Sequence, residues 1–261
     1  MPMRLATWNI NSLSVRLPQV LDWLAANPVD ALGLQELKLV DEKFPYDALK
    51  EAGYHAAVFG QKTYNGVAIL SRTPVTDVVR NIPQHADDQS RVIAGTLDTP
   101  DGPLRLVNCY FVNGQAPGTE KFAYKMRWLE ALHRWLQEEL KVHQRLVLLG
   151  DFNVAPEDRD SFDPVGLKDT IHHTVEEREH FKALIQLGLT DAYRMFEQPE
   201  KSYSWWDYRM LGFQKNRGLR IDHILVSEAL RGTVTACQID RLPRKNPQPS
   251  DHAPVVVTLG G

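Results

Sequence analysis

Residues 145–156, with the sequence RLVLLGDFNVAP, constrain the fold of this 261-residue chain more than any other stretch. A short apolar run between glycine and proline is typical of a strand that is buried on both faces of an α/β sheet. Because side chains alternate along a strand, we expect Asp151 and Asn153 to point the same way and Phe152 to enter the core. Ligands bind at the carboxyl ends of such strands, although a turn in which Asp and Asn bond nearby backbone explains the stretch equally well.

The composition predicts an ordinary globular protein, with 43% hydrophobic and 24% charged residues. No Pro/Gly/Ser-rich linker or charge block divides the chain, so we expect one domain over residues 1–261. The first residues do not resemble a secretory signal, and no apolar run is long enough to cross a membrane. Cys109 and Cys237 lie inside apolar runs and are expected to be buried thiols, which favours a cytoplasmic location and no membrane partner.

The net charge of −3 does not indicate a nucleic-acid-binding protein by itself. Between residues 201 and 250, however, nine basic residues outnumber four acidic ones. Scattered Lys and Arg are most often solvated surface charge, so this asymmetry permits DNA binding without requiring it.

Apolar runs in the first half predict strands that alternate with two helices. Helical spacing over residues 15–24, with Ser14 as N-cap, predicts the first helix, and residues 45–52 form a second that stops at Gly53. Closely spaced runs with Gly and Pro turns between them favour antiparallel pairing. The predicted strands cover residues 4–9, 30–36, 54–59, 66–71, 75–79, 92–97 and 104–112.

The second half contains the most regular helical pattern, an apolar stripe over residues 119–141. A further helix is expected over residues 176–187, closed by Gly188. Four more strand-like runs cover residues 203–208, 219–226, 233–239 and 255–259. Strands outnumber helices, and helices separate some of the strands, so we predict an α/β fold.

Polar residues recur at the ends of these apolar runs. Each has an independent structural explanation, such as a turn, an N-cap or an ion pair. Several unpaired carboxylates at the ends of buried strands would be costly, so a shared cation or charge network explains the set better. Oxygen ligands without a Cys/His cluster suit Mg²⁺ or Mn²⁺. The set comprises Asn9, Glu36, Tyr110, Asp151, Asn153, Asp222, Asp251 and His252.

Seven blocks spread in order over nearly the whole chain resemble the exonuclease III family of apurinic/apyrimidinic endonucleases, within the endonuclease/exonuclease/phosphatase superfamily. The GDFN and SDH motifs occur throughout the superfamily, whereas the WDYR and GLRID motifs resemble its DNA-repair branch. The blocks are residues 7–12 (TWNINS), 34–36 (LQE), 65–71 (NGVAILS), 150–153 (GDFN), 205–209 (WWDYR), 218–222 (GLRID) and 249–255 (PSDHAPV).

The resemblance implies a four-layered α/β sandwich, with two mixed β-sheets packed face to face and flanked by helices. It also implies a metal site at Glu36, assisted by Asn9 and Asp251. It assigns proton transfer to Asp151 and a hydrogen-bonded pair near the scissile phosphate to Asp222 and His252. It also implies that Asn153 orients the phosphate or nucleophile and that Tyr110 contacts the phosphate. Val112 departs from the family, because many relatives have proline there, which fixes φ.

Substrate contacts are expected from the same resemblance, and Asn11 occupies a position where some relatives carry aspartate. An aromatic residue of the WWDYR block would line a pocket for an abasic sugar or terminal nucleotide. Residues 210–218, together with Arg209, Lys215 and Arg217, are expected to form a mobile basic loop that grips phosphates. Bulky groups in residues 162–174 are expected to favour 3′ ends, gaps or nicks over internal abasic sites, with His172 and His173 as specificity candidates. The expected DNA-binding residues are Asn11, Asn65, Arg91, Asn113, Trp205, Arg209 and Arg220.

The expected function is therefore Mg²⁺- or Mn²⁺-dependent hydrolysis of DNA phosphodiesters in base excision repair, by 3′ to 5′ exonuclease, 3′-end cleaning or abasic-site endonuclease activity. The expected partner is double-stranded DNA with abasic sites, nicks, gaps or recessed 3′ ends, bound by a monomer. Two alternatives are a superfamily phosphatase that acts on a soluble or lipid phosphate and a DNA-binding relative without catalysis. Metal dependence distinguishes the non-catalytic relative from the enzymes, because a protein that only binds DNA should bind it equally well with and without a chelator.

Overall fold

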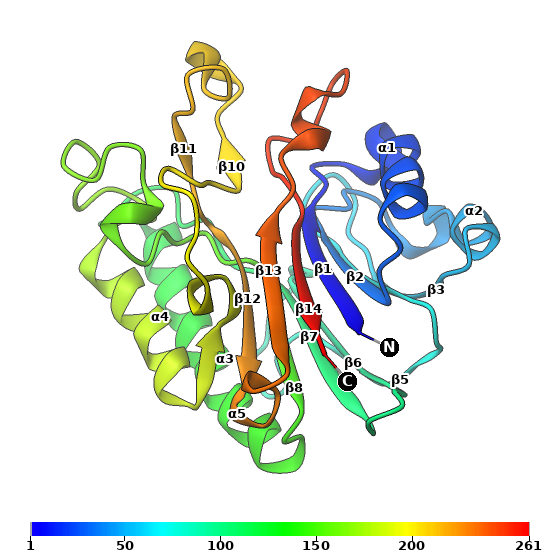
Figure 1. Ribbon diagram of the computed structural model, residues 1–261. Helices are drawn as coiled ribbons and strands as arrows, with labels where there is room; N and C mark the ends of the chain where they lie inside the picture. The colour runs from blue at the N-terminus through cyan, green and yellow to red at the C-terminus, as the bar shows by residue number, and fades with distance from the viewer. Residues whose placement is uncertain (1, 261) are drawn as a thin grey trace.

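The computed structural model describes residues 2–260, so the two terminal residues of the expected domain lie outside the described part. Two six-stranded sheets pack face to face (Figure 1). The first has the order β13-β14-β1-β2-β4-β3 and consists of β1 (Met3–Asn9), β2 (Ala31–Gln35), β3 (His55–Phe59), β4 (Val67–Ser71), β13 (Val234–Ile239) and β14 (Val255–Leu259). The second has the order β5-β6-β7-β8-β12-β9 and consists of β5 (Val75–Arg80), β6 (Val92–Leu97), β7 (Leu104–Tyr110), β8 (Leu146–Asp151), β9 (Leu189–Asp191) and β12 (Asp222–Ser227).

Helices cover the outer faces of both sheets, so the molecule is the expected four-layered α/β sandwich (Figure 1). Helices α1 (Leu13–Ala26) and α2 (Tyr46–Glu51) pack on the first sheet, and α3 (Glu120–Val142) and α4 (Val175–Gln186) pack on the second. The short helix α5 (Glu228–Arg231) follows β12. No helix among residues 2–260 is both long enough and apolar enough to cross a membrane.

Strand alternation produces three apolar layers between the four structural layers. Leu5 of β1 points into the layer between the sheets, whereas its neighbour Ala6 faces α1 and α2. In the same way Val147 of β8 faces the first sheet and Leu148 faces α3. The central strands are apolar at nearly every position because both of their faces are buried.

Each sheet contains one parallel pair of strands at its centre. β1 runs parallel to β2, with α1 between them in sequence, and β7 runs parallel to β8, with α3 between them. The other strand pairs of the two sheets are antiparallel, including the pairs that were expected among residues 54–112. The carboxyl ends of both parallel pairs contribute side chains to one shared site, through Asn9 of β1 and Asp151 of β8.

Three local expectations were wrong. Helix α1 begins at Leu13 with Ser12 at its N-cap, so Ser14 lies inside the helix. The run 203–208 contributes only β10 (Trp205–Trp206), which pairs with β11 (Gly218–Leu219) in a ribbon beyond the two sheets. The run 219–226 is likewise divided into β11 and β12, because the chain leaves the ribbon and enters the second sheet there.

Candidate active site

The side chain of Asn9 joins the two sheets at the site. Its Nδ2 donates hydrogen bonds to Oε1 of Glu36 at 2.8 Å and to Oδ2 of Asp151 at 2.9 Å. Asn9 and Asp151 are the last residues of β1 and β8, and Glu36 follows β2 directly. The expectation that polar strand ends converge is therefore correct for these three residues.

Glu36, Asp151 and His252 form the group of potential metal ligands among the described residues, with one ligand atom from each within 4.8 Å of the others. Two carboxylates of this group can supply the oxygen ligands that Mg²⁺ or Mn²⁺ requires, so the donor set fits such an ion. Nζ of Lys38 lies 3.1 Å from Oε2 of Glu36 and also donates to Asn11. The ammonium group of Lys38 thus partly neutralises the negative charge of Glu36, which a bound metal ion would also neutralise.

Asp251 lies beside this group. Its Oδ1 accepts a hydrogen bond from Asn11 at 3.1 Å, and its Oδ2 accepts one from the indole of Trp205 at 3.0 Å. The geometry therefore ties Asp251 to two predicted DNA contacts more directly than to Glu36.

His252 lies between two buried carboxylates. Its Nδ1 is 2.9 Å from Oδ2 of Asp222, and its Nε2 is 3.6 Å from Oδ2 of Asp151. Burial alone would lower the pKa of His252, but Asp222 and Asp151 raise it to about 10, which favours the imidazolium. The hydroxyl of Ser204 donates to Asp222 at 2.6 Å and fixes that carboxylate.

Burial raises the pKa of Asp151, with Asp222 and Glu36 acting in the same direction and His252 opposing them. A carboxyl group with a raised pKa can hold a proton near neutral pH, which suits a group that exchanges protons with the substrate. The proton-transfer assignment of Asp151 is thus chemically reasonable, although the geometry alone does not test it.

Asn153 faces the site for a reason other than strand alternation. Its φ is 49°, and its backbone N–H donates to Oδ1 of Asp151 at 3.0 Å, so the chain turns here. Its side chain donates to the carbonyl of Phe111 at 3.0 Å and accepts from Asn113 at 3.3 Å. Phe152 is fully buried as expected, while the common direction of Asp151 and Asn153 comes from a turn.

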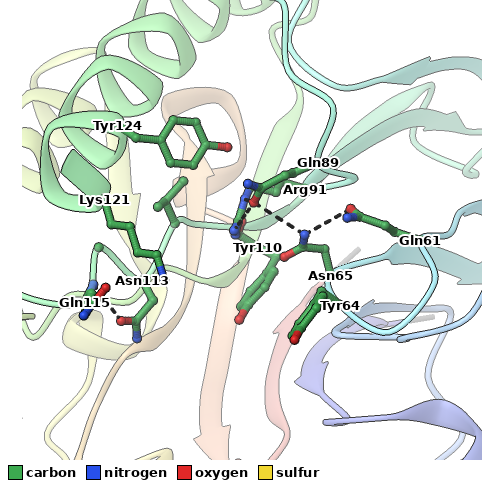
Figure 2. Close-up of a pocket in the computed structure, with 12 residues that line it drawn as sticks. Gln61, Tyr64, Asn65, Gln89, Arg91, Tyr110, Asn113, Gln115, Lys121 and Tyr124 are labelled. Atoms are coloured by element: carbon green, nitrogen blue, oxygen red, sulfur yellow. Dashed lines mark hydrogen bonds between the residues drawn. The ribbon is translucent and has the colours of Figure 1, made fainter.

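A cavity of about 550 Å³ lies on one side of the site (Figure 2). Tyr110, which pairs in register with Asp151, stands on its wall, and the guanidinium of Arg91 lies 5.0 Å from the centre of the Tyr110 ring. Burial and the neighbouring Glu36 hold the pKa of Tyr110 well above its usual value, so its hydroxyl remains a donor. The lining also includes the expected DNA contacts Asn65 and Asn113 and the cation of Lys121.

A second cavity of about 430 Å³ is more apolar and is lined by Trp205, His172 and His173. Trp206 is fully buried in the core, whereas its neighbour Trp205 lines this cavity. Both histidines are buried, and burial lowers their pKa values, that of His172 to about 4. Hydrogen bonds hold both rings in the cavity wall. Nδ1 of His172 lies 2.7 Å from the carbonyl of Asn153, and Nε2 of His173 lies 2.9 Å from the hydroxyl of Ser161.

Arg220 does not reach the site, so its expected contact with DNA is not supported. Its side chain is 1% exposed and is bound by Asp160 at 2.7 Å and Asp191 at 2.8 Å. Its Nη1 also donates to Nδ1 of His223 at 3.0 Å. The bonds to Asp160, Asp191 and His223 occupy the guanidinium of Arg220 within the protein interior, so its role is structural. Arg209 differs, because it lies in the connection between β10 and β11, its side chain is 88% exposed, and Asp207 is only 3.9 Å from it. It also lines the apolar cavity.

Sequence reasoning missed several polar residues that hold the site. Lys38 and Ser204 contact Glu36 and Asp222, and Gln89 accepts from Arg91 at 2.9 Å. Lys38 follows the LQE block by two positions, which is a local signal, whereas Ser204 and Gln89 lie in stretches without a distinctive pattern.

Comparison with known proteins places these features in a family context. The sequence profile of the Endonuclease/Exonuclease/phosphatase family matches residues 6–252. Exodeoxyribonuclease III of Haemophilus influenzae is 35% identical over 266 residues, which cover 97% of this chain and 98% of that protein. The structure of the 3′ phosphatase NExo from Neisseria bound to a product DNA hairpin is 47% identical, with a TM-score of 0.96 over 99% of this chain and 100% of that one. An AP endonuclease from Archaeoglobus fulgidus is 34% identical, with a TM-score of 0.93 over 98% and 99% of the two chains.

Proposed function

This chain belongs to the Endonuclease/Exonuclease/phosphatase family, and on that premise we propose that it is a divalent-metal-dependent DNA-repair phosphodiesterase. The observation that carries the proposal is the cluster of Glu36, Asp151, Asp222 and His252, joined through Asn9 at the meeting point of the two sheets. Full-length similarity to exodeoxyribonuclease III and to a DNA-bound 3′ phosphatase supports DNA as the substrate.

Glu36, His252 and Asp151 each have a separate role in the proposed hydrolysis. Mg²⁺ or Mn²⁺ held by Glu36 and its neighbours would neutralise charge that develops on the phosphate oxygens. His252, kept cationic by Asp222, provides a positive donor for the same oxygens. Asp151 exchanges a proton with the attacking water or with the departing 3′ oxygen, a role that contributes about 10²–10⁴-fold in other enzymes.

The amide of Asn153 and the hydroxyl of Tyr110 hold the phosphate in line with the attacking water. The Tyr110 hydroxyl stays protonated because burial raises its pKa, so it can donate to a phosphate oxygen. Asn113 reaches the same place through its hydrogen bond with Asn153. Positioning of this kind accounts for much of the catalysis of phosphoryl transfer.

The two cavities on either side of the site suggest how DNA is held. The cavity with Arg91 and Lys121 is cationic and suits the phosphate backbone, together with Asn65 and Asn113. The apolar cavity with Trp205 suits a sugar or a terminal nucleotide. Arg209 on the ribbon and Asn11 beside Asp251 would extend the contacts to flanking phosphates.

The preferred substrate is proposed to be a 3′ end, nick or gap in double-stranded DNA, with internal abasic sites cut less readily. Segment 162–174 narrows the apolar cavity through Phe162, His172 and His173. We further propose that the protein works as a cytoplasmic monomer. A double substitution of His172 and His173 by Gly should raise the ratio of abasic-site incision to 3′-end cleavage, and an unchanged ratio would argue against this role.

The test uses purified protein with Mg²⁺ on two end-labelled duplexes. One contains an internal abasic-site analogue, and the other has a recessed or nicked undamaged 3′ end. Laddering from the 3′ end with the analogue spared is the expected result. A single cut at the analogue would make the enzyme chiefly an abasic endonuclease, and no cleavage of either duplex would sink the nuclease assignment.

A further inference from the structure

Lys125 of α3 is a buried cation beneath the site that the mechanism above does not use. Its side chain is 0% exposed, and its Nζ donates to the carbonyl of Asn153 at 2.8 Å and to that of Asn113 at 3.2 Å. Its third partner is the carboxylate of Glu177, which is also 0% exposed. The three donors of one ammonium group are therefore all used in the protein interior.

Glu177 anchors this ammonium to α4. Its Oε2 accepts hydrogen bonds from the backbone N–H of Thr174 at 3.1 Å and from the Thr174 hydroxyl at 2.9 Å. The Thr174 hydroxyl in turn accepts from the backbone N–H of Glu177, which completes a capping box at the start of the helix. The bonds to Thr174 thus fix the position of the Glu177 carboxylate independently of its contact with Lys125.

The local backbone is shaped around Lys125. Gly114 has a φ of +88°, and a Cβ at this position would lie 2.8 Å from Cδ of Lys125. Glycine is therefore required both for the backbone conformation and for the approach of the lysine stem. Asn153 also has a positive φ, 49°, and its carbonyl accepts from Lys125 and contacts His172.

A buried ion pair is weak evidence for stability, because desolvation of two charges offsets most of their attraction. Its location suggests a different role. The two carbonyls that Lys125 holds belong to Asn113 and Asn153, whose side-chain amides are joined at 3.3 Å next to Asp151. One ammonium thus fixes the spacing between two loops that carry site residues.

We propose that Lys125 and Glu177 are a pair of positioning residues that set the geometry of Asn113 and Asn153 for the in-line reaction. The inference rests on the proposed function, because it concerns the rate of that reaction. Loss of the pair lowers kcat more than it raises KM, because Asn113 is only one of several residues proposed to contact the DNA. A misplacement of about 1 Å in a catalytic group can cost about 10²-fold in rate, which sets the scale of the effect.

The experiment compares Lys125→Met with the double variant Lys125→Met/Glu177→Met. The single variant leaves a buried carboxylate unpaired and should be unstable, whereas the double variant replaces both charges and should recover most of the stability. The matched control is Arg105→Met/Glu139→Met, which removes a mostly buried ion pair at the opposite end of β7 from Tyr110. Thermal melting, kcat and KM are measured for each protein on a duplex with a recessed 3′ end.

The expected result is a double variant with near-wild-type melting, a kcat lowered by about 10- to 100-fold and a KM within about threefold. The control pair should keep the wild-type kcat. The single variant Lys125→Arg, which keeps a cation at this position, should have a kcat between those of the double methionine variant and the wild type. A double variant with wild-type kcat would overturn the inference while leaving the proposed function intact. Failure of the wild-type protein to cleave the duplex would overturn both.

If the methionine variants do not fold, Glu177→Gln serves instead. It keeps the shape of the side chain and an oxygen for the Thr174 bonds, but it leaves Lys125 without its counter-charge. A lowered kcat with unchanged KM supports the positioning role, and an unchanged kcat overturns it.

Discussion

Nδ1 of His252 lies 2.9 Å from Oδ2 of Asp222, and Nε2 of the same ring faces Asp151 at 3.6 Å. The imidazole therefore carries its charge between two carboxylates, each of which is held by a further donor: Ser204 bonds Asp222, and Asn9 bonds Asp151. Asp222 orients the ring, and the opposite nitrogen remains directed toward Asp151.

Replacing Asp222 by Asn should lower kcat by about 10²–10⁴-fold, because His252 loses the carboxylate that favours its charged form. DNA affinity should stay within a few-fold of wild type. Single-turnover cleavage and binding to a labelled duplex in chelator measure the two effects separately. Ser204→Ala is the milder comparison, and the assignment fails if both variants cleave at the wild-type rate.

Asp151→Asn and His252→Ala should each abolish turnover while leaving DNA binding nearly intact. Both side chains are buried at the site, and neither lies on the exposed DNA-contacting surface. Gel-based cleavage and equilibrium binding on the same duplex provide the measurement. Wild-type-like activity in either variant would remove that residue from the mechanism.

Chelation of divalent metal should abolish cleavage, and addition of Mg²⁺ or Mn²⁺ should restore it. Asn9→Ala should raise the metal concentration for half-maximal activity by about 10–100-fold, because Asn9 orients Glu36 and Asp151. A Mn²⁺ binding titration of the variant gives an independent measure. Equal metal affinities in variant and wild type would contradict this role.

Arg220→Met should destabilise the fold by about 3–5 kcal/mol, because it leaves Asp160 and Asp191 buried without their common cation. Urea unfolding measures the loss. DNA affinity, measured below the melting temperature of the variant, should be unchanged. A large loss of affinity in a stably folded variant would restore Arg220 to the DNA-binding set.

His223 should make the protein less stable in mild acid. Burial, with Arg220 beside it, lowers the pKa of His223 to about 4, from about 6.5 in an unfolded chain. Between these values the unfolded state binds the proton more readily, so the contribution of neutral His223 is lost as pH falls from 6.5 toward 4. The loss between pH 7 and pH 5 is about 2 kcal/mol.

The measurement for His223 compares urea unfolding of wild type and His223→Asn at pH 7 and pH 5. Asp151 titrates in the opposite sense, because its raised pKa favours the folded state as pH falls, but this effect is common to both proteins and cancels. The stability difference between the two proteins should therefore shrink at pH 5. A constant difference at both pH values would show that His223 is not held neutral.

The sequence predicted the parts of the site that follow apolar runs. Asn9, Glu36 and Asp151 each follow a buried run of regular length, and parallel pairing brings the ends of such runs together. The turn at Asn153 was one of two readings of this stretch, and the sequence did not decide between them, because a positive φ in a non-glycine residue has only a weak sequence signal.

Arg220 and Lys125 show why the rest could not be predicted. The main partners of Arg220, Asp160 and Asp191, lie 60 and 29 positions away in the chain, and Glu177 lies 52 positions from Lys125. From sequence alone each cation resembles solvated surface charge, which is the usual state of Lys and Arg. Only tertiary packing reveals that both are buried.

The position of β14 has a consequence for the order in which the protein matures. β14 is the last strand among residues 2–260, yet it lies between β13 and β1 and pairs with β1, the first strand of that range, with Met3 opposite Leu259. During synthesis the pairing of β1 with β14 cannot form until β14 has been made, and pairing between segments so distant in sequence is slow. His252 lies on the segment just before β14. On the proposed mechanism, a nascent chain would therefore have no complete site until this segment is in place. Incomplete products on the ribosome would thus be inert toward DNA.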